Sequence, residues 1–102
     1  MKYSALLERL GFEKRAAEIY LFLLEKGLNS VSVIAKSLGY HRAEIYQSLP
    51  LLLEEKIIAR VAKGKRFFYR AENPVILQKK FEAFELQYKA AIPKLLDSFR
   101  DR

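Results

Sequence analysis

The stretch "SVSVIAKSLGYHRAEIYQSL" holds two helical patterns that meet at one glycine, and this junction constrains the fold more than any other feature of the chain. Ser30 or Ser32 can cap the first helix, because a hydroxyl accepts from the free N–H groups of a first turn. Gly39 ends that helix, and helical spacing resumes at His41. A helix, a tight turn and a second helix are predicted, which is a helix-turn-helix.

The second helix has an apolar and a polar side. The residues predicted to face inward are Ile45, Leu49, Leu52 and Leu53. The opposite side is predicted to present His41, Arg42, Glu44, Gln47 and Ser48. Arginine, glutamine and serine are residue types that read base edges in the major groove, while an ordinary solvated helix face is the alternative. Glu44 repels phosphate, so it is expected either to accept from cytosine or to pair with Arg42 or another nearby basic residue.

Pro50 falls inside this second helix. A proline there costs about 3 kcal/mol and clashes with the carbonyl four residues earlier, here that of Tyr46. A kink near residues 46–50 is predicted, which leaves the first two turns free to enter a groove. The alternative is an irregular helix that reads DNA poorly.

The period changes from helical to alternating over residues 57–71, which predicts two short strands around Lys63-Gly64. A hairpin directly after a helix-turn-helix is a wing. Upstream, residues 3–10 and 13–26 are predicted helices, and Gly27 ends the second as a left-handed cap would. Without an internal repeat or a flexible linker, the 102 residues are expected to form one compact unit, mainly helical with a small β-hairpin.

Asn73-Pro74 predicts the start of a long last helix, because proline is favoured at a first helical position. Apolar residues then recur at alternating steps of four and three, at Leu77, Phe81, Phe84, Tyr88, Ala91 and Leu95. This spacing favours a dimer seam, and packing against its own domain is the alternative. Pro93 predicts a kink, after which the end of the helix can fold back.

Several classes of protein are excluded by composition. The chain has no cysteine and one histidine, so it offers neither disulfides nor a thiolate metal site, and no metal or cofactor is expected. No catalytic grouping is present, so an enzyme is not expected. No apolar run reaches the length of a signal peptide core or a membrane span, which predicts a cytoplasmic protein.

The net charge of +7 is concentrated in one short segment. Residues 57–72 contain five basic residues and one acid, and the predicted wing carries Lys63, Lys65, Arg66 and Arg70. Such a stripe suits phosphates or a minor groove, although a charged strand edge also blocks aggregation. Phe68 shares a face with Arg66 and Arg70, and it is expected to pack under the last helix or a dimer partner.

Taken together, "LGFEKRAAEIYLFLLEKG", "SVIAKSLGYHRAEIYQSL" and "GKRFFYRAENP" resemble the TrmB-like winged-helix domain of archaeal and bacterial transcriptional regulators. The matching residues are Leu10, Gly11, Ala17, Tyr20, Ala35, Arg42, Tyr46 and Tyr69 to Ala71. The resemblance implies DNA binding by a dimer. It makes Arg42 a groove or phosphate contact and Arg66 a wing contact, while Tyr46 touches DNA or only packs.

The chain departs from the family pattern at several places. Lys56 stands where the family usually has glycine, Glu44 is an acid on the reading face, and Pro50 replaces a polar helix former. Family members often continue into a sugar-binding domain, whereas this sequence ends at Arg102, so sugar sensing is not expected.

The resulting prediction is a winged helix-turn-helix in residues 1–72 and a dimerisation helix in residues 73–102. It is expected to regulate transcription as a homodimer that reads a palindromic site with residues 41–49. The predicted DNA-binding residues are Ser32, Lys36, His41, Arg42, Glu44, Tyr46, Gln47, Lys63, Lys65, Arg66 and Arg70. A winged-helix module that binds proteins and a nonspecific chromatin-like DNA binder are the alternatives.

Overall fold

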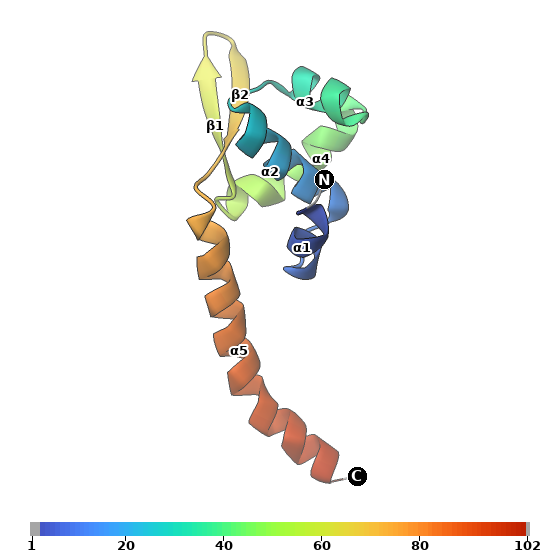
Figure 1. Ribbon diagram of the computed structural model, residues 1–102, viewed down its shortest axis with the longest axis vertical. Helices are drawn as coiled ribbons and strands as arrows, with labels where there is room; N and C mark the ends of the chain where they lie inside the picture. Colours follow the sequence, from blue (N-terminus) through green and yellow to red (C-terminus); the bar gives the residue numbers. More distant parts are fainter. Residues whose placement is uncertain (1–2, 102) are drawn as a thin grey trace.

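A computed structural model describes residues 3–101, which form five helices and one hairpin. Their order is α1 (Ser4–Arg9), α2 (Lys14–Lys26), α3 (Val31–Leu38), α4 (Arg42–Glu54), β1 (Ile58–Lys63), β2 (Arg66–Ala71) and α5 (Val75–Arg100). Figure 1 shows α1–α4 and the hairpin gathered at one end, with α5 running away from them. The predicted elements and the mainly helical fold class are confirmed.

The core is built around α2, which contacts α1, α3, α4 and β2. Its buried side chains are Ala16, Ala17, Ile19, Tyr20, Phe22 and Leu23. Leu24 is exposed although it fits the apolar spacing. The helix ends at Lys26, and Gly27 is the residue that caps it. Gly27 has φ 81° with ψ −156°, which is not the left-handed conformation that was predicted for this cap.

The helix-turn-helix forms as predicted. The Val33 N–H donates to the Ser30 hydroxyl (3.3 Å), so Ser30 is the cap of α3. Gly39 adopts the left-handed conformation (φ 79°, ψ 28°), and its N–H and that of Tyr40 both donate to the Ala35 carbonyl (2.9 Å each). This C-cap satisfies an end carbonyl and turns the chain, which places Ile45 of α4 in the core.

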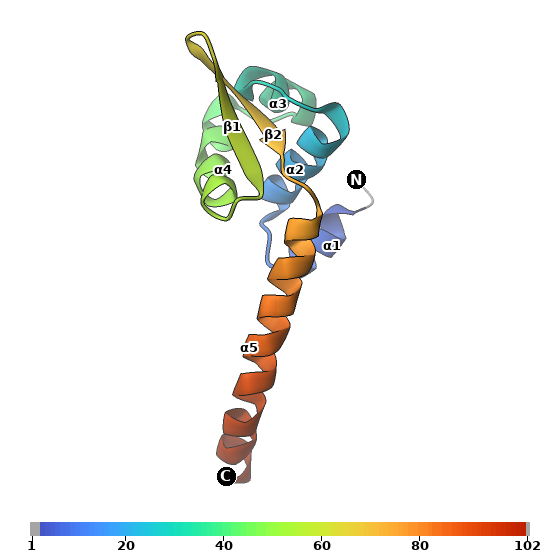
Figure 2. The same cartoon turned by 90° about the vertical axis from the view of Figure 1, so that its left-hand side faces the viewer.

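The hairpin pairs Ile58 with Ala71 and Lys63 with Arg66, so its turn is Gly64-Lys65. The turn therefore lies one residue beyond the predicted Lys63-Gly64, and Lys65 is outside both strands. On its other edge β2 exchanges two backbone hydrogen bonds with Asn29 at 2.8 and 3.0 Å. This extra bridge ties the wing to the segment that precedes α3 (Figure 2).

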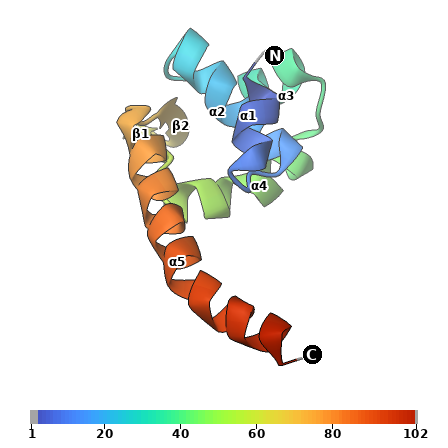
Figure 3. The ribbon, with the colours of Figure 1, turned by 60° about the horizontal axis from the view of Figure 1, so that its bottom comes forward.

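None of the side chains of α5 between Val75 and Arg100 is buried. Ile76 and Leu77 are partly buried against the core, and Lys80 forms an ion pair with Glu55. Pro93 lies inside the helix, yet α5 continues to Arg100 and does not fold back (Figure 3). Within residues 3–101, no helix is both long and apolar enough to cross a membrane.

The end of α4 explains a departure from the family pattern. The Ile57 N–H donates to the Leu52 carbonyl (2.9 Å), and the Lys56 N–H donates to the Leu53 carbonyl (3.1 Å). These two bonds define a Schellman motif, which places Lys56 at the position where glycine is favoured. Lys56 accordingly has φ 61°, and among the described residues it is the one non-glycine residue with positive φ.

We expect Lys56→Gly to stabilise the protein. Glycine removes the left-handed strain of about 1–2 kcal/mol but adds chain entropy to the unfolded state, so a net gain of about 0.5–1 kcal/mol is expected. Thermal unfolding followed by circular dichroism measures it. Lys56→Ala is the control, because alanine removes the charge but keeps the Cβ atom. An equal gain in both variants would attribute the effect to charge instead of backbone conformation.

Pro50 lies on the exposed side of α4, and the helix continues through it to Glu54. Leu49 and Leu52, on either side of it, are buried, so packing holds this turn in place. Proline has no N–H, so the Tyr46 carbonyl lacks its usual helical donor at this position.

We expect Pro50→Ala to keep or raise the melting temperature, because alanine restores an N–H donor for Tyr46 and has the best helix propensity. The gain should be smaller than the full proline cost of about 3 kcal/mol, since the native helix already accommodates the ring. Differential scanning calorimetry measures the change. A clear loss of stability would mean that the ring is required for packing.

Candidate nucleic-acid interface

A groove with a volume of about 260 Å³ lies between the start of α3, the first turns of α4 and β2. We call it the wing groove. It is lined by Ser30, Val31, Ser32, Arg42, Tyr46, Lys65, Arg66, Phe67 and Tyr69. Hydroxyls, three cationic residues and aromatic rings therefore face one concave surface. Such a set suits a phosphodiester backbone, whose oxygens accept hydrogen bonds and whose sugars offer apolar contact.

The wing has two different faces, because opposite residues of a hairpin share a face. One face turns Ile58 and Tyr69 into the core and carries Arg60 and Phe67 farther along the strands. There the Arg60 guanidinium lies over the Phe67 ring, 4.5 Å from its centroid, and Phe67 is 51% exposed. An exposed aromatic ring with a stacked cation is a suitable surface for a negatively charged polymer.

The other face of the wing carries Lys63, Arg66 and Arg70 around Phe68. Lys63 Nζ and the Arg66 guanidinium lie 5.8 and 5.6 Å from the centre of the half-buried Phe68 ring. Arg70 forms an ion pair with Glu72 at 3.6 Å. Phe68 thus contacts the cations of its own strand pair, whereas the sequence analysis predicted that it packs under the last helix or a dimer partner.

The outward side of α4 presents Arg42, Ala43, Tyr46 and Gln47, all exposed. Ser48 was predicted on this side, and that prediction is wrong. Ser48 lies next to Ile45 around the helix and is buried, and its hydroxyl accepts from Arg15 Nε at 2.7 Å. Ala43 takes a central place on the outward side, where a methyl group can contact thymine.

Arg15 of α2 makes several contacts with α4. Its Nη2 donates to the Gln47 side-chain oxygen at 3.4 Å and lies 3.4 Å from a Glu13 carboxylate oxygen. Its Nη1 lies 3.7 Å from a Glu44 oxygen, and the guanidinium lies 5.9 Å from the centre of the Tyr40 ring. The Arg15 side chain is 19% exposed and its bond to Ser48 is partly buried, whereas its contacts with Gln47 and Glu13 lie at the surface.

Glu44 is occupied on both of its carboxylate oxygens. One accepts from the His41 backbone N–H at 2.9 Å, which caps the start of α4, and the other faces Arg15. The predicted ion pair therefore forms with Arg15 of α2 and not with Arg42. The Glu44 carboxylate is therefore directed toward α2 and the start of α4. It is not a free acceptor for cytosine.

Two tyrosines fix α2 to its neighbours. The Tyr40 hydroxyl donates to a Glu18 carboxylate oxygen at 2.6 Å, and this hydrogen bond raises the pKa of Tyr40 to about 12, with smaller contributions from burial and nearby charge. The Tyr20 hydroxyl donates to the Glu72 carbonyl at 3.0 Å. Burial, and then the Glu72 charge, raise the pKa of Tyr20. Both phenols stay protonated donors near neutral pH.

Apart from Glu44, which is half-buried and is held by His41 and Arg15, the predicted site residues fall into two groups. The wing groove brings together Ser32, Arg42, Tyr46, Lys65 and Arg66. The remaining predicted basic and polar side chains lie outside that groove and are exposed, namely Lys36, His41, Gln47, Lys63 and Arg70. Sequence reasoning missed Arg60, Phe67 and Arg15. The hairpin register would have placed Arg60 beside Phe67, whereas no local pattern signals Arg15.

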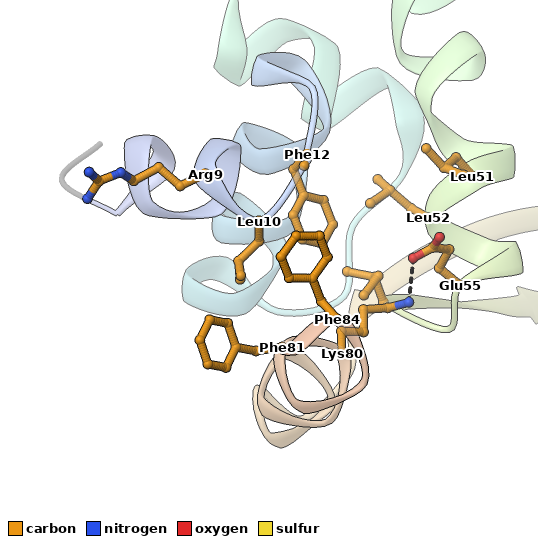
Figure 4. A pocket seen from close by; sticks show the side chains of 11 residues that line it. Arg9, Leu10, Phe12, Leu51, Leu52, Glu55, Lys80, Phe81 and Phe84 are labelled. Carbon is orange, nitrogen blue, oxygen red and sulfur yellow. Dashed lines mark hydrogen bonds and ion pairs between the residues drawn. The ribbon is translucent and has the colours of Figure 1, made fainter. Parts of the chain in front are cut away.

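A second hollow separates α5 from the rest of the chain, and we call it the α5 cleft. It has a volume of about 280 Å³ and is lined by Arg9, Leu10, Gly11, Phe12, Leu51, Leu52, Glu55, Ile57, Lys80, Phe81 and Phe84. Figure 4 shows Phe84 beside Phe12 and Phe81 beside Leu10, with the ion pair of Lys80 and Glu55 at one side. The first half of the predicted seam therefore faces its own domain.

The second half of the seam extends beyond the winged domain. Tyr88 and Leu95 are exposed, and Phe99, four residues after Leu95, continues the same stripe with 72% of its surface exposed. Between residues 3 and 101, no three His, Cys, Asp or Glu side chains gather as a metal site would require.

The sequence and the structure were compared with protein families and with solved structures. The model of a family described as "Sugar-specific transcriptional regulator TrmB" matches residues 7–75, which is more than half of the chain. A comparison with curated protein sequences finds no match.

Solved structures share the fold. A possible transcriptional regulator from Methanosarcina mazei Go1 has a TM-score of 0.75 at 14% identity, over 87% of this chain and 80% of that one. TrmBL2, described as an archaeal chromatin protein, has a TM-score of 0.79 at 18% identity, over 98% of this chain. This chain spans only 39% of TrmBL2. ZitR from Lactococcus lactis, solved in complex with DNA, has a TM-score of 0.54 at 16% identity, over 88% of this chain and 74% of that one.

Proposed function

The chain belongs to the TrmB family of transcriptional regulators, and from this premise we propose that it is a cytoplasmic homodimer that binds a palindromic site in double-stranded DNA. The α4 helix reads bases in the major groove, and the wing holds the adjacent backbone. A two-fold dimer presents two copies of α4, so its site repeats as two inverted half-sites.

The observation that carries this proposal is the wing groove. Arg42 and Tyr46 come from the first turns of α4, while Lys65, Arg66 and Phe67 come from the hairpin. A backbone strand lying between them would meet cations on both sides, together with the Ser32 hydroxyl near the start of α3. Placing α4 in a major groove brings the wing onto the flanking phosphates, so one docking pose uses both surfaces.

The residues divide by role. Arg42 and Gln47 are the candidates for base edges, because they are exposed at the start and middle of the outward side of α4. Lys36, Lys63, Lys65, Arg66 and Arg70 are candidates for phosphate contacts. His41 and Tyr46 flank the reading side. Glu44 holds the start of α4 in place, which reconciles an acid on this helix with a polyanionic partner.

We expect substitutions in the wing and in α4 to change DNA binding in different ways. Arg66→Ala should weaken binding to all duplexes alike and reduce the salt slope by about one unit, because a phosphate contact carries no sequence information. Arg42→Ala or Gln47→Ala should cost about 1–3 kcal/mol on a selected duplex and much less on random DNA. Titration of each variant against both duplexes at two salt concentrations separates the two effects.

Lys79→Ala is the matched control for lost charge, because Lys79 is exposed on α5 and outside the wing groove. If both helix variants keep the wild-type preference for the selected duplex, α4 does not read the site. Binding without any preference would then describe a DNA coater. A salt-independent complex with protein and no DNA binding would describe a docking module.

The dimer proposal is supported by the lack of cover on α5. The α5 helix has 26 residues, an apolar stripe and no buried side chain. This is unusual for a helix that stays alone in water, because an exposed apolar stripe contributes little to helix stability. The stripe runs from Phe81 and Phe84 at the α5 cleft to Leu95 and Phe99. A second copy supplies an identical stripe, so pairing the two covers both.

We expect Phe84→Asp and Leu95→Asp each to convert the dimer into a monomer, because a carboxylate in an apolar seam loses its water without gaining a partner. Sedimentation equilibrium at micromolar to high micromolar concentration measures the mass. Leu86→Asp is the control, since Leu86 is 71% exposed and lies on the opposite side of α5. A wild-type monomer at the highest concentration would rule out the seam.

A further inference from the structure

Gln47 is held by a residue that lies outside the DNA-facing surface. Its side-chain oxygen accepts from Nη2 of Arg15, and Arg15 Nε donates to Ser48 one position later on α4. Resting on the DNA-reading role of α4 proposed above, we propose that Arg15 is a positioning residue that fixes the Gln47 amide and thereby sets which base edge Gln47 reads.

Arg15 is not available as a DNA contact itself. Each guanidinium nitrogen has a protein partner: Nε has Ser48, Nη1 has Glu44, and Nη2 has Gln47 and Glu13. Two carboxylates and the Tyr40 ring surround the group, and its side chain is mostly covered. Its charge is therefore compensated within the protein, and its planar fork can fix the direction of more than one partner.

The consequence follows from the planarity of an amide. When the Gln47 oxygen faces Arg15, the Nε2 amino group is turned away from that guanidinium, and because Gln47 is exposed its N–H donors are available to a ligand. Glutamine reads adenine with both its oxygen and its nitrogen, whereas an amide whose oxygen is turned toward Arg15 and already accepts one hydrogen bond presents mainly its N–H donors to a base. Gln47 should therefore select a base that presents an acceptor in the major groove, such as guanine through O6 or N7.

The test is selection of bound duplexes from a random pool by the full-length protein and its variants. The wild type should retain, at one position of each half-site, a base with a major-groove acceptor. Arg15→Met should lose the preference at that position alone, by about 2- to 10-fold, which is the factor expected for one hydrogen bond. Gln47→Ala should lose the base preference at the same position. The double variant should lose no more of that preference than Gln47→Ala alone.

Two controls separate positioning from support of the fold. Lys14→Met removes the same charge from the neighbouring exposed residue and should leave every position unchanged. Ser48→Ala removes the Nε bond but keeps the Gln47 contact, so it should lower stability and preserve the preference. Arg15→Met should also leave the salt slope at its wild-type value, because no phosphate contact is lost.

A direct readout keeps this proposal distinct from the proposed function. In the DNA-free protein, NMR relaxation of the Gln47 side-chain NH₂ group should show an ordered amide that becomes mobile in Arg15→Met. An amide equally mobile in both proteins overturns the positioning role even where α4 reads DNA. An ordered amide in a protein without sequence preference overturns DNA reading by α4 instead, and with it the selection of a base by Arg15.

Discussion

The packing of α2 is the interaction on which the rest of the structure depends. Four elements contact this helix, and its buried positions hold two alanines followed by four large apolar or aromatic side chains. Ala16 and Ala17 permit close approach of neighbouring backbones, while Ile19, Tyr20 and Leu23 fill the space beyond them. A change in α2 would therefore move α3, α4 and the wing together, although no residue of its buried side is offered to DNA.

Polar contacts complement this apolar core at specific points. The Tyr20 hydroxyl holds the end of the wing through Glu72, and Arg15 and Glu18 of α2 hold Ser48 of α4 and Tyr40 just before it. Apolar packing sets the distance between helices but tolerates some rotation, because it has no direction. Hydrogen bonds have direction, so these few contacts fix the rotation of α4 about its axis. The face that α4 offers to the outside follows from that rotation.

The sequence was sufficient for the fold because its local signals agree with one another. The cap at Ser30, the glycine at Gly39 and the alternation after residue 57 each indicate the same junctions that the structure has. Ser48 was misplaced because one polar residue beside Ile45 looks like a surface residue until its partner is known. That partner is Arg15, 33 residues earlier in the chain, and no periodicity reports a contact over such a separation.

The same limit applies to α5. The apolar spacing correctly predicted a stripe along α5. Spacing alone does not show whether that stripe faces the winged domain or points away from it. Only the backbone path after Ala71 places Phe81 and Phe84 opposite Phe12 and Leu10. Phe99 was omitted because Pro93 suggested an earlier end of the regular helix, whereas the structure continues it to Arg100.

The attachment of α5 near one end makes it a lever. It is held near Ile76, Leu77 and Lys80, it faces the winged domain as far as Phe84, and it extends away from that domain beyond this point. With 26 residues it is about 39 Å long. A rotation of about 10° at the attached end would shift the far end by about 7 Å, which is close to two base-pair steps along B-DNA. In a dimer paired along α5, the spacing between two half-sites would thus be set mainly by the angle at this attachment. Sequence variation at Glu55 and Lys80 would change that spacing without altering a single residue that touches a base.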